Sequence, residues 1–178
     1  GKTVVLALDA TGSRYATLPV PDTITMMMHV VMGRFGLDFP LADFLTDAPD
    51  AAFFAGREEL VAVAVARLAV AGSLLVVGAS GAGKSSVVRA GMIPSLVAGA
   101  LPGSETWQID VATPTGGLPV GGPDGPGRLL VVDQLEELLS LPVDAGAALV
   151  QQLAARATKG TMLVLVARTD HYAGLAGE

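Results

Sequence analysis

The 178-residue sequence contains no cysteine, which excludes disulfide bonds and metal sites built from thiolates. It has only two histidines, His29 and His171, and their wide separation in the sequence argues against a histidine metal site. The lack of cysteine also fits a reducing compartment. We therefore expect a cytoplasmic protein without a resident metal cluster.

Positive charge is scarce as well. Lysine occurs only at Lys2, Lys84 and Lys159, and the net charge of the chain is −6. A surface of this charge repels the phosphates of nucleic acids, and no basic stripe in the sequence opposes that repulsion. We therefore expect no direct binding of nucleic acid.

One apolar run, Leu60–Val77, is long enough to resemble a membrane span. However, Arg67 lies in its middle, and Gly72 and Ser73 break it. The part before the break fits a helix and the part after it fits a strand. We expect a buried helix followed by a buried strand, and no membrane segment.

The chain divides into two regions of different character. In residues 1–50, apolar alternation at Val4–Leu8 and the segment Arg14–Leu18 predict two strands around a turn. A helix is predicted next at Thr23–Phe35. A linker-like stretch follows, and residues 54–178 are expected to form the main domain.

From Gly56 onward, helices alternate with short strands that are almost wholly apolar. Such strands are typical of a parallel sheet covered on both faces, so we expect an α/β, three-layer sandwich with a mostly parallel sheet. Pro94 is expected to interrupt the helix that begins at Lys84, because proline has no N–H to donate. The predicted strands are Leu74–Val77, Trp107–Ala112, Leu129–Val132 and Met162–Ala167, and the predicted helices are Glu58–Ala71, Lys84–Met92, one within Glu136–Leu139, and Ala145–Ala157.

The segment between two of these strands has an unusual composition. From Thr113 to Gly127, ten of the fifteen residues are glycine or proline. This composition excludes a regular helix and predicts an exposed loop.

A phosphate-binding P-loop lies between the strand Leu74–Val77 and the next helix. Its residues satisfy G-x-x-x-x-G-K-[ST] at every position: Gly78, Ala79, Ser80, Gly81, Ala82, Gly83, Lys84 and Ser85. Small residues let successive backbone N–H groups point at a phosphate, and the following helix adds its positive end. Lys84 is expected to contact the β- and γ-phosphates, and the Ser85 hydroxyl to ligate Mg²⁺. The sequence thus predicts binding of a Mg-nucleoside triphosphate.

An acidic partner for the P-loop follows the apolar strand Leu129–Val132. Asp133 stands at the carboxyl end of this strand, the edge where ligands of open α/β sheets bind. Together with Ser85 it is the expected metal-binding pair. A chance acidic residue at the end of a buried strand is the alternative interpretation.

Candidates for catalysis lie farther along the chain. Glu136 is the first candidate to orient an attacking water, with Glu137 and Gln134 behind it. These acids could instead only favour the start of a helix. Arg168 follows the last apolar strand at the same edge of the sheet, where it could sense the γ-phosphate or remain a solvated strand-end arginine.

Phe54–Tyr172 resembles the novel STAND NTPases of the first subgroup, which are signal-transduction ATPases with numerous domains. Five stretches carry the resemblance: FAGREEL (Phe54–Leu60), GASGAGKSSVVRAGMIPSL (Gly78–Leu96), LPGSETW (Leu101–Trp107), LLVVDQLEELL (Leu129–Leu139) and VARTDHY (Val166–Tyr172). The resemblance implies an ATP-driven switch, with slow hydrolysis or exchange changing its assembly with itself or with effector domains. It also implies that Arg57 approaches the nucleotide, and Ser86 joins the expected nucleotide contacts.

The sequence departs from that family in two places. The Gly/Pro-rich loop stands where family members carry a helix and more chain, and the usual Asp-Phe-Tyr ending is Asp170-His171-Tyr172. The helical subdomain that normally follows is not in this sequence, so we expect a truncated domain.

Residues 1–50 resemble a different family, an uncharacterised group of predicted periplasmic proteins with a LolA-like half-barrel. The matching stretches are GKTVVLALDATGSRYATLPVPDTI and GRFGLDFPLADFL. The match covers only a fragment of such a domain. A fused or truncated gene product, in which this segment adds no activity, is one interpretation.

Two other functions share the P-loop. A small-molecule kinase should have an arginine-rich lid, but the Gly/Pro-rich loop contains no arginine before Arg128. A degenerate module would hold nucleotide without turnover. Bound nucleotide without phosphate release would distinguish it from the leading hypothesis, a P-loop ATPase.

Overall fold

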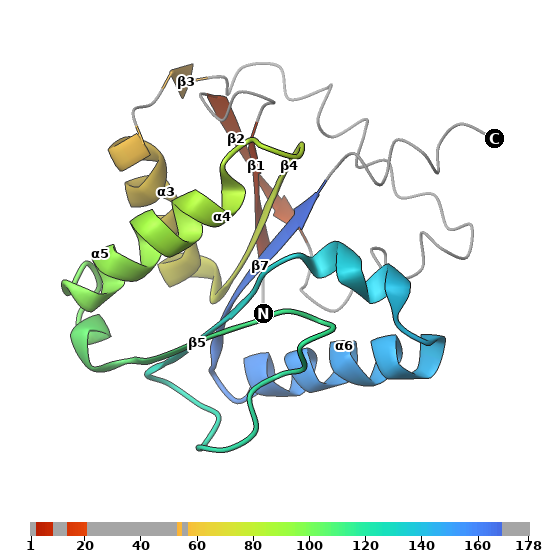
Figure 1. Ribbon diagram of the computed structural model, residues 1–178. Coiled ribbons are helices and arrows are strands. Elements are labelled where there is room, and N and C mark those ends of the chain that lie inside the picture. The colour runs from red at the N-terminus through yellow and green to blue at the C-terminus, as the bar shows by residue number, and fades with distance from the viewer. Residues whose placement is uncertain (1–2, 9–13, 21–52, 55–56, 169–178) are drawn as a thin grey trace.

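The computed structural model describes residues 3–8, 14–20, 53–54 and 57–168, and within them it contains one seven-stranded sheet in the order β3-β2-β1-β4-β7-β6-β5 (Figure 1). Strands β1, β4, β7, β6 and β5 pair in parallel, whereas β2 and β3 are antiparallel to their neighbours. The mostly parallel sheet predicted from the sequence is therefore confirmed. The strands are β1 (Thr3–Leu8), β2 (Arg14–Val20), β3 (Phe53–Phe54), β4 (Ser73–Gly78), β5 (Gln108–Ala112), β6 (Arg128–Val132) and β7 (Met162–Arg168).

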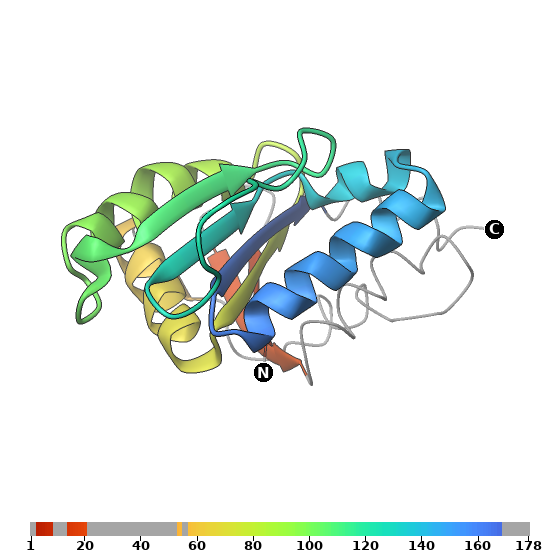
Figure 2. The same ribbon diagram turned by 90° about the horizontal axis from the view of Figure 1, so that it is seen from below.

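Helices cover both faces of this sheet, as the three-layer prediction requires. Figure 2 shows the sheet between α3, α4 and α5 on one side and α6 on the other. None of the described helices is long and apolar enough to cross a membrane. The helices are α3 (Arg57–Ala71), α4 (Lys84–Ser86), the π-helix η2 (Val87–Met92), α5 (Ile93–Val97), the 3₁₀ helices η3 (Ser104–Thr106) and η4 (Leu135–Ser140), and α6 (Val143–Thr158).

The apolar strands supply two cores because side chains alternate between the faces of a sheet. Leu74 and Val76 of β4 pack on the α3 side, with Leu68 and Met92. Leu75 and Val77 of the same strand pack on the α6 side. Both faces of β4 are buried, which explains why its residues Leu74–Val77 are all apolar.

The N-terminal hairpin belongs to the same sheet. Strand β1 lies parallel to β4, with Thr3 beside Ser73 and Leu8 beside Gly78, and β2 folds back antiparallel to β1. The predicted hairpin is thus confirmed. The helix predicted at Thr23–Phe35 lies outside the described residues, and the division of the chain into two domains stays a prediction.

Pro94 does not interrupt the helix after the P-loop, so this prediction is wrong. The backbone remains helical from Lys84 to Val97 through α4, η2 and α5. Pro94 lies in the first turn of α5, directly after the π-helical turns, and the N–H of Ile93 donates to the carbonyl of Val88. Proline is tolerated here because the hydrogen-bond pattern changes from π-helical to α-helical at this point, and Pro94 lies in the first turn of the new α-helical stretch.

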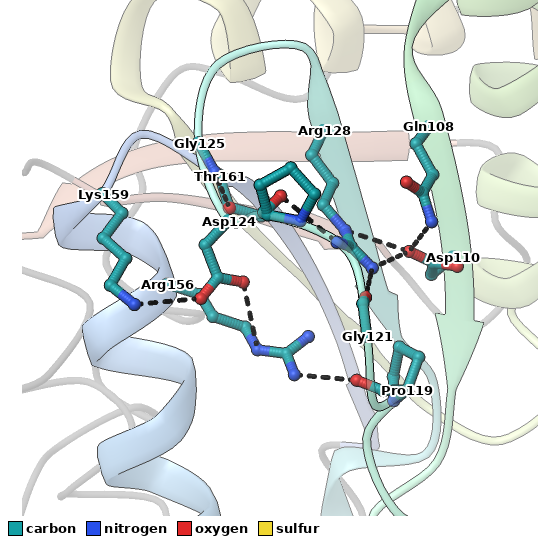
Figure 3. A network of polar contacts seen from close by, with 11 residues as sticks. Gln108, Asp110, Pro119, Gly121, Asp124, Gly125, Arg128, Arg156, Lys159 and Thr161 are labelled. Carbon is teal, nitrogen blue, oxygen red and sulfur yellow. Dashed lines mark hydrogen bonds and ion pairs between the residues drawn. The ribbon is translucent and has the colours of Figure 1, made fainter.

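The Gly/Pro-rich segment, residues 113–127, is a loop without helix or strand, as predicted. The base of this loop is held by Arg128, whose side chain is 4% exposed (Figure 3). Its Nη2 lies 2.8 Å from Asp110 Oδ2 and donates to the carbonyl of Gly121 at 3.0 Å. Its Nη1 donates to the carbonyl of Pro123.

The same loop is also tied to α6 and to the start of β7. Arg156 donates to the carbonyl of Pro119 at 2.8 Å, and Lys159 pairs with Asp124 at 3.2 Å. The backbone N–H of Gly125 donates to Thr161 Oγ1 (Figure 3). The loop is therefore fixed by specific polar contacts even though its composition excludes regular structure.

Candidate functional site

A pocket of about 240 Å³ lies where β4, β6 and β7 end. Asp133, Gln134 and Glu136 line it beyond β6, and Val166 and Arg168 line it from β7. The remaining lining comes from the P-loop, through Ser80, Gly81, Lys84 and Ser85. The structure thus brings together most of the residues that the sequence predicts as a site, at the edge of the sheet where such sites are expected.

The backbone of the P-loop adopts its turn through two glycines. Gly81 and Gly83 have φ angles of 81° and 83°, values that a residue with a side chain adopts only with strain. Gly83 directly precedes the helix that Lys84 begins. The Lys84 side chain is buried, and its Nζ donates to the carbonyl of Ala79 at 2.6 Å. The Lys84 side chain is thereby held against the P-loop, the loop that would also bind a phosphate.

Gly78, the first glycine of the motif, also has a packing role that the sequence does not reveal. A Cβ at this position would lie 2.9 Å from the backbone oxygen of Leu8 in β1. No Cβ comes that close without a shift, so the approach of the neighbouring strand by itself requires glycine at position 78. The N-terminal hairpin therefore constrains the start of the P-loop.

The carboxylate of Asp133 is the centre of the site. Ser85 Oγ donates to Asp133 Oδ1 at 3.0 Å, and the backbone N–H of Gln134 donates to the same oxygen at 3.0 Å. Gln134 has a φ of 56° and is the only non-glycine residue with positive φ in the described part of the chain. A left-handed residue beside a buried acid is typical of a functional turn.

Arg89 is a further residue of this site, and sequence reasoning missed it. Its Nε lies 3.0 Å from Asp133 Oδ2, forming an ion pair with the buried carboxylate. Arg89 follows Ser85 by one helical turn, and residues four apart share a helix face. That spacing was the available signal, because Ser85 was already expected to face Asp133.

The acidic residues after β6 separate into two directions. Glu136 lines the pocket and accepts a hydrogen bond from the backbone N–H of Arg168 at 3.2 Å. Glu137 instead binds Thr115 in the Gly/Pro-rich loop through both the hydroxyl and the backbone N–H of that residue. The Thr115 hydroxyl, and then its N–H, hold the pKa of Glu137 below its usual range. The geometry favours Glu136 over Glu137 as the group near a ligand.

The last two predicted contacts lie elsewhere. Ser86 lines a separate groove of about 320 Å³ between α3 and the helix after the P-loop, together with Glu58, Val61 and Ala90. Arg57 begins α3 beside this groove, and the structure describes only its backbone. Ser85 and Ser86, consecutive residues of one helix, therefore line two different cavities, which share no lining residue.

The residues of the polar pocket fit a magnesium ion. A hydroxyl from Ser85 and a carboxylate from Asp133 are hard oxygen ligands, and their side chains already lie within hydrogen-bonding distance of each other. Mg²⁺ in nucleotide sites is usually held by one or two such protein groups together with phosphates and water. The donor set therefore suits Mg²⁺ bound with a nucleotide.

Comparison with protein families agrees with this geometry. A family model described as Novel STAND NTPase 1 matches residues 41–122, and one described as Predicted periplasmic protein (DUF2092) matches residues 1–69. Both resemblances inferred from the sequence are thus confirmed. No curated protein and no solved structure matches the chain.

The two matches differ in what they contribute to the site. The STAND NTPase match contains the whole P-loop, and this match therefore indicates nucleotide binding. It ends before Asp133, Glu136 and Arg168, so the placement of these three residues rests on the structure. The two matched ranges overlap at residues 41–69.

Proposed function

We propose that this chain is a switch module that binds Mg-ATP and hydrolyses it slowly. The observation that carries the proposal is the 3.0 Å hydrogen bond between Ser85 Oγ and Asp133 Oδ1. It joins the P-loop to the acid at the end of β6, the two parts that phosphoryl-transfer sites of this class use together. The STAND NTPase match over the P-loop supports the same reading.

Binding of the triphosphate would rely on the P-loop. The backbone N–H groups at the start of the helix favour anions, and Lys84 adds a full positive charge. One of its partners, the carbonyl of Ala79, is neutral. Charged phosphate oxygens form stronger hydrogen bonds with an ammonium group than such a carbonyl does.

Mg²⁺, when bound, would neutralise charge on the β- and γ-phosphates. Ser85 and Asp133 would hold it, and Asp133 is kept in position by the N–H of Gln134.

The groove beside Ser86 supports a nucleoside rather than a free phosphate as the ligand. It is continuous in sequence with the phosphate site, and Val61, Val87 and Ala90 give it an apolar wall. A purine base presents apolar faces that suit such a wall. We propose that the base lies here, near the start of α3, and that the nucleotide is ATP as in the STAND proteins that the sequence resembles.

Glu136 and Arg168 are proposed to act on the terminal phosphate. Glu136 would orient an attacking water, which is the step that a hydrolase of this type requires. Arg168 lines the same pocket, and its backbone N–H fixes the Glu136 carboxylate. Loss of the γ-phosphate would thus affect the ends of β6 and β7 together. On this basis we propose a switch whose state is detected by effector domains or through self-association.

The test is titration of the chain with a fluorescent ATP analogue, with and without Mg²⁺. Lys84→Ala should abolish saturable binding, and Asp133→Asn should reduce its Mg²⁺ dependence. Lys159→Ala is the matched control, since Lys159 is an exposed lysine that pairs with Asp124 at the far end of β7. Competition by GTP and by inorganic triphosphate measures what the base contributes.

Binding and turnover are separate outcomes. No binding by a folded wild-type chain, or equal binding by Lys84→Ala, would contradict the proposal. Saturable binding without release of phosphate would replace the ATPase with a module that holds nucleotide without hydrolysis. Phosphate release in single-turnover assays decides between these two functions.

A further inference from the structure

Asp133 carries more partners than a metal-binding acid needs. Its side chain is only 5% exposed, and three donors surround it at 3.0 Å: Ser85 Oγ, the Gln134 N–H and Arg89 Nε. Among these donors only Arg89 carries a full charge. The buried carboxylate is therefore balanced by a guanidinium group.

The Arg89 side chain can move away from Asp133. Its side chain is 50% exposed, whereas the carboxylate that it binds is buried. A half-exposed arginine can move into solvent without opening the core. Arg89 also lies within the π-helix η2, and such π-helical turns are rare and frequently occur at functional sites.

We propose that Arg89 is a counter-cation that competes with Mg²⁺ for Asp133. It balances the buried carboxylate while no metal is present, and it is displaced when Mg-nucleotide binds. This inference rests on the proposed function. It assigns to Arg89 a role in setting how strongly nucleotide binding depends on the metal.

The electrostatics support an exchange rather than joint occupancy. A buried carboxylate without a cationic partner is costly, so Asp133 needs one cation in either state. A guanidinium at 3.0 Å from the carboxylate lowers the negative potential that would attract Mg²⁺, and the two cations would repel each other beside the same carboxylate. Each cation therefore weakens the binding of the other.

The experiment compares wild type with Arg89→Gln as full chains. The affinity for a fluorescent ATP analogue is measured in EDTA and across a Mg²⁺ titration. We expect Arg89→Gln to lower the half-saturating Mg²⁺ concentration about two- to fivefold, the range that corresponds to losing one partly exposed ion pair. Arg156→Gln is the matched control, because it removes the ion pair with Asp124 at the opposite edge of the sheet.

Two results would overturn the inference while leaving nucleotide binding intact. An unchanged half-saturating Mg²⁺ concentration would mean that Arg89 and the metal do not compete. A higher one would mean that Arg89 positions Asp133 for the metal instead. A similar change in Arg156→Gln would assign the effect to general stability or net charge.

A second measurement needs neither Mg²⁺ nor nucleotide. Unfolding of wild type, Arg89→Gln, Asp133→Asn and the double variant in EDTA should show that the two substitutions are coupled, with at least about a threefold departure from independent effects on the unfolding constant. Independent effects would reject the ion pair itself. A wild type that binds no nucleotide would remove the proposed function, and coupling alone would then leave Arg89 with a structural role only.

Discussion

The carboxylate of Glu136 accepts a hydrogen bond from the backbone N–H of Arg168, with 3.2 Å between Oε2 and the nitrogen. This contact links η4, which follows β6, to the end of β7 across the pocket. Because a backbone N–H cannot swing away as a side chain can, it fixes the direction of the carboxylate. Glu136 is therefore held in one orientation beside the proposed γ-phosphate site.

Glu136→Gln should abolish most hydrolysis and leave binding intact. The amide oxygen can still accept from the Arg168 N–H, but it cannot act as a base. We expect phosphate release to fall about 10²-fold or more, with the affinity for the ATP analogue unchanged. Glu137→Gln is the matched control, because Glu137 binds Thr115 instead. Loss of activity in Glu137→Gln alone would reverse the assignment.

Removing the Thr115 hydroxyl should change stability in a pH-dependent manner. The pKa of Glu137 is lowered from 4.5 by the Thr115 hydroxyl and N–H, so the ionised carboxylate stabilises the folded state. This contribution is complete above pH 4.5 and is lost as the pH falls through the lowered pKa. The difference in unfolding free energy between wild type and Thr115→Val should therefore shrink in acid.

The control for that experiment is a second exposed threonine. The hydroxyl of Thr106 donates to the backbone carbonyl of Gly103, which does not titrate. The difference between wild type and Thr106→Val should stay constant over the same pH range. A Thr115→Val difference that is equally constant, or that grows in acid, would contradict the role given to Glu137.

Gly91→Ala should destabilise the protein by about 1–3 kcal/mol. A Cβ at Gly91 would lie 2.3 Å from Cγ2 of Val61, where η2 packs on α3, and a β-branched valine has few alternative rotamers. Gly146→Ala in α6 is the matched control, since its Cβ would meet only the Leu138 oxygen at 3.7 Å. That variant should be neutral or stabilising by about 0.5–1 kcal/mol. Denaturant unfolding distinguishes the two, and equal effects would contradict the close packing at Gly91.

Arg128→Met should cost about 2–4 kcal/mol, because it leaves Asp110 and two loop carbonyls without a buried partner. Hydrogen exchange should also become faster in residues 113–127, whose anchor is lost. Lys159→Ala removes a pair whose lysine side chain is 62% exposed, and it should change the stability by less than about 0.5 kcal/mol. Equal effects of the two substitutions would show that Arg128 does not hold the loop.

Local patterns were sufficient to predict the strands and the P-loop. Apolar runs such as Leu129–Val132 indicate a strand buried on both faces. The P-loop motif is a consecutive pattern, so a match identifies its residues directly. The placement of Asp133 opposite Ser85 followed from the rule that parallel strands end at one edge of the sheet. These predictions depend on properties of a short stretch of chain.

Contacts between distant segments were not predictable in the same way. The pairing of β1 with β4 leaves no local mark, since alternating apolar residues fit an independent hairpin equally well. In the sequence alone, Pro94 indicates the end of a helix. Only the π-helical turns before it explain why the helix continues past this residue. The sequence indicates only that Arg128 lies at the start of a strand. Its role in holding the Gly/Pro-rich loop depends on its contact with Asp110.

The central position of β4 has a consequence for how the protein folds. The strand that carries the P-loop is flanked by β1, made from residues 3–8, and by β7, made from residues 162–168. Pairings between such distant segments form late and slowly, because loop-closure entropy must be overcome first. During synthesis β4 emerges with only one of its two neighbouring strands, and its edge toward β7 stays unpaired until nearly all of the described chain has been made. The phosphate-binding turn is therefore completed among the last parts of the molecule, although its motif is the most local signal in the sequence.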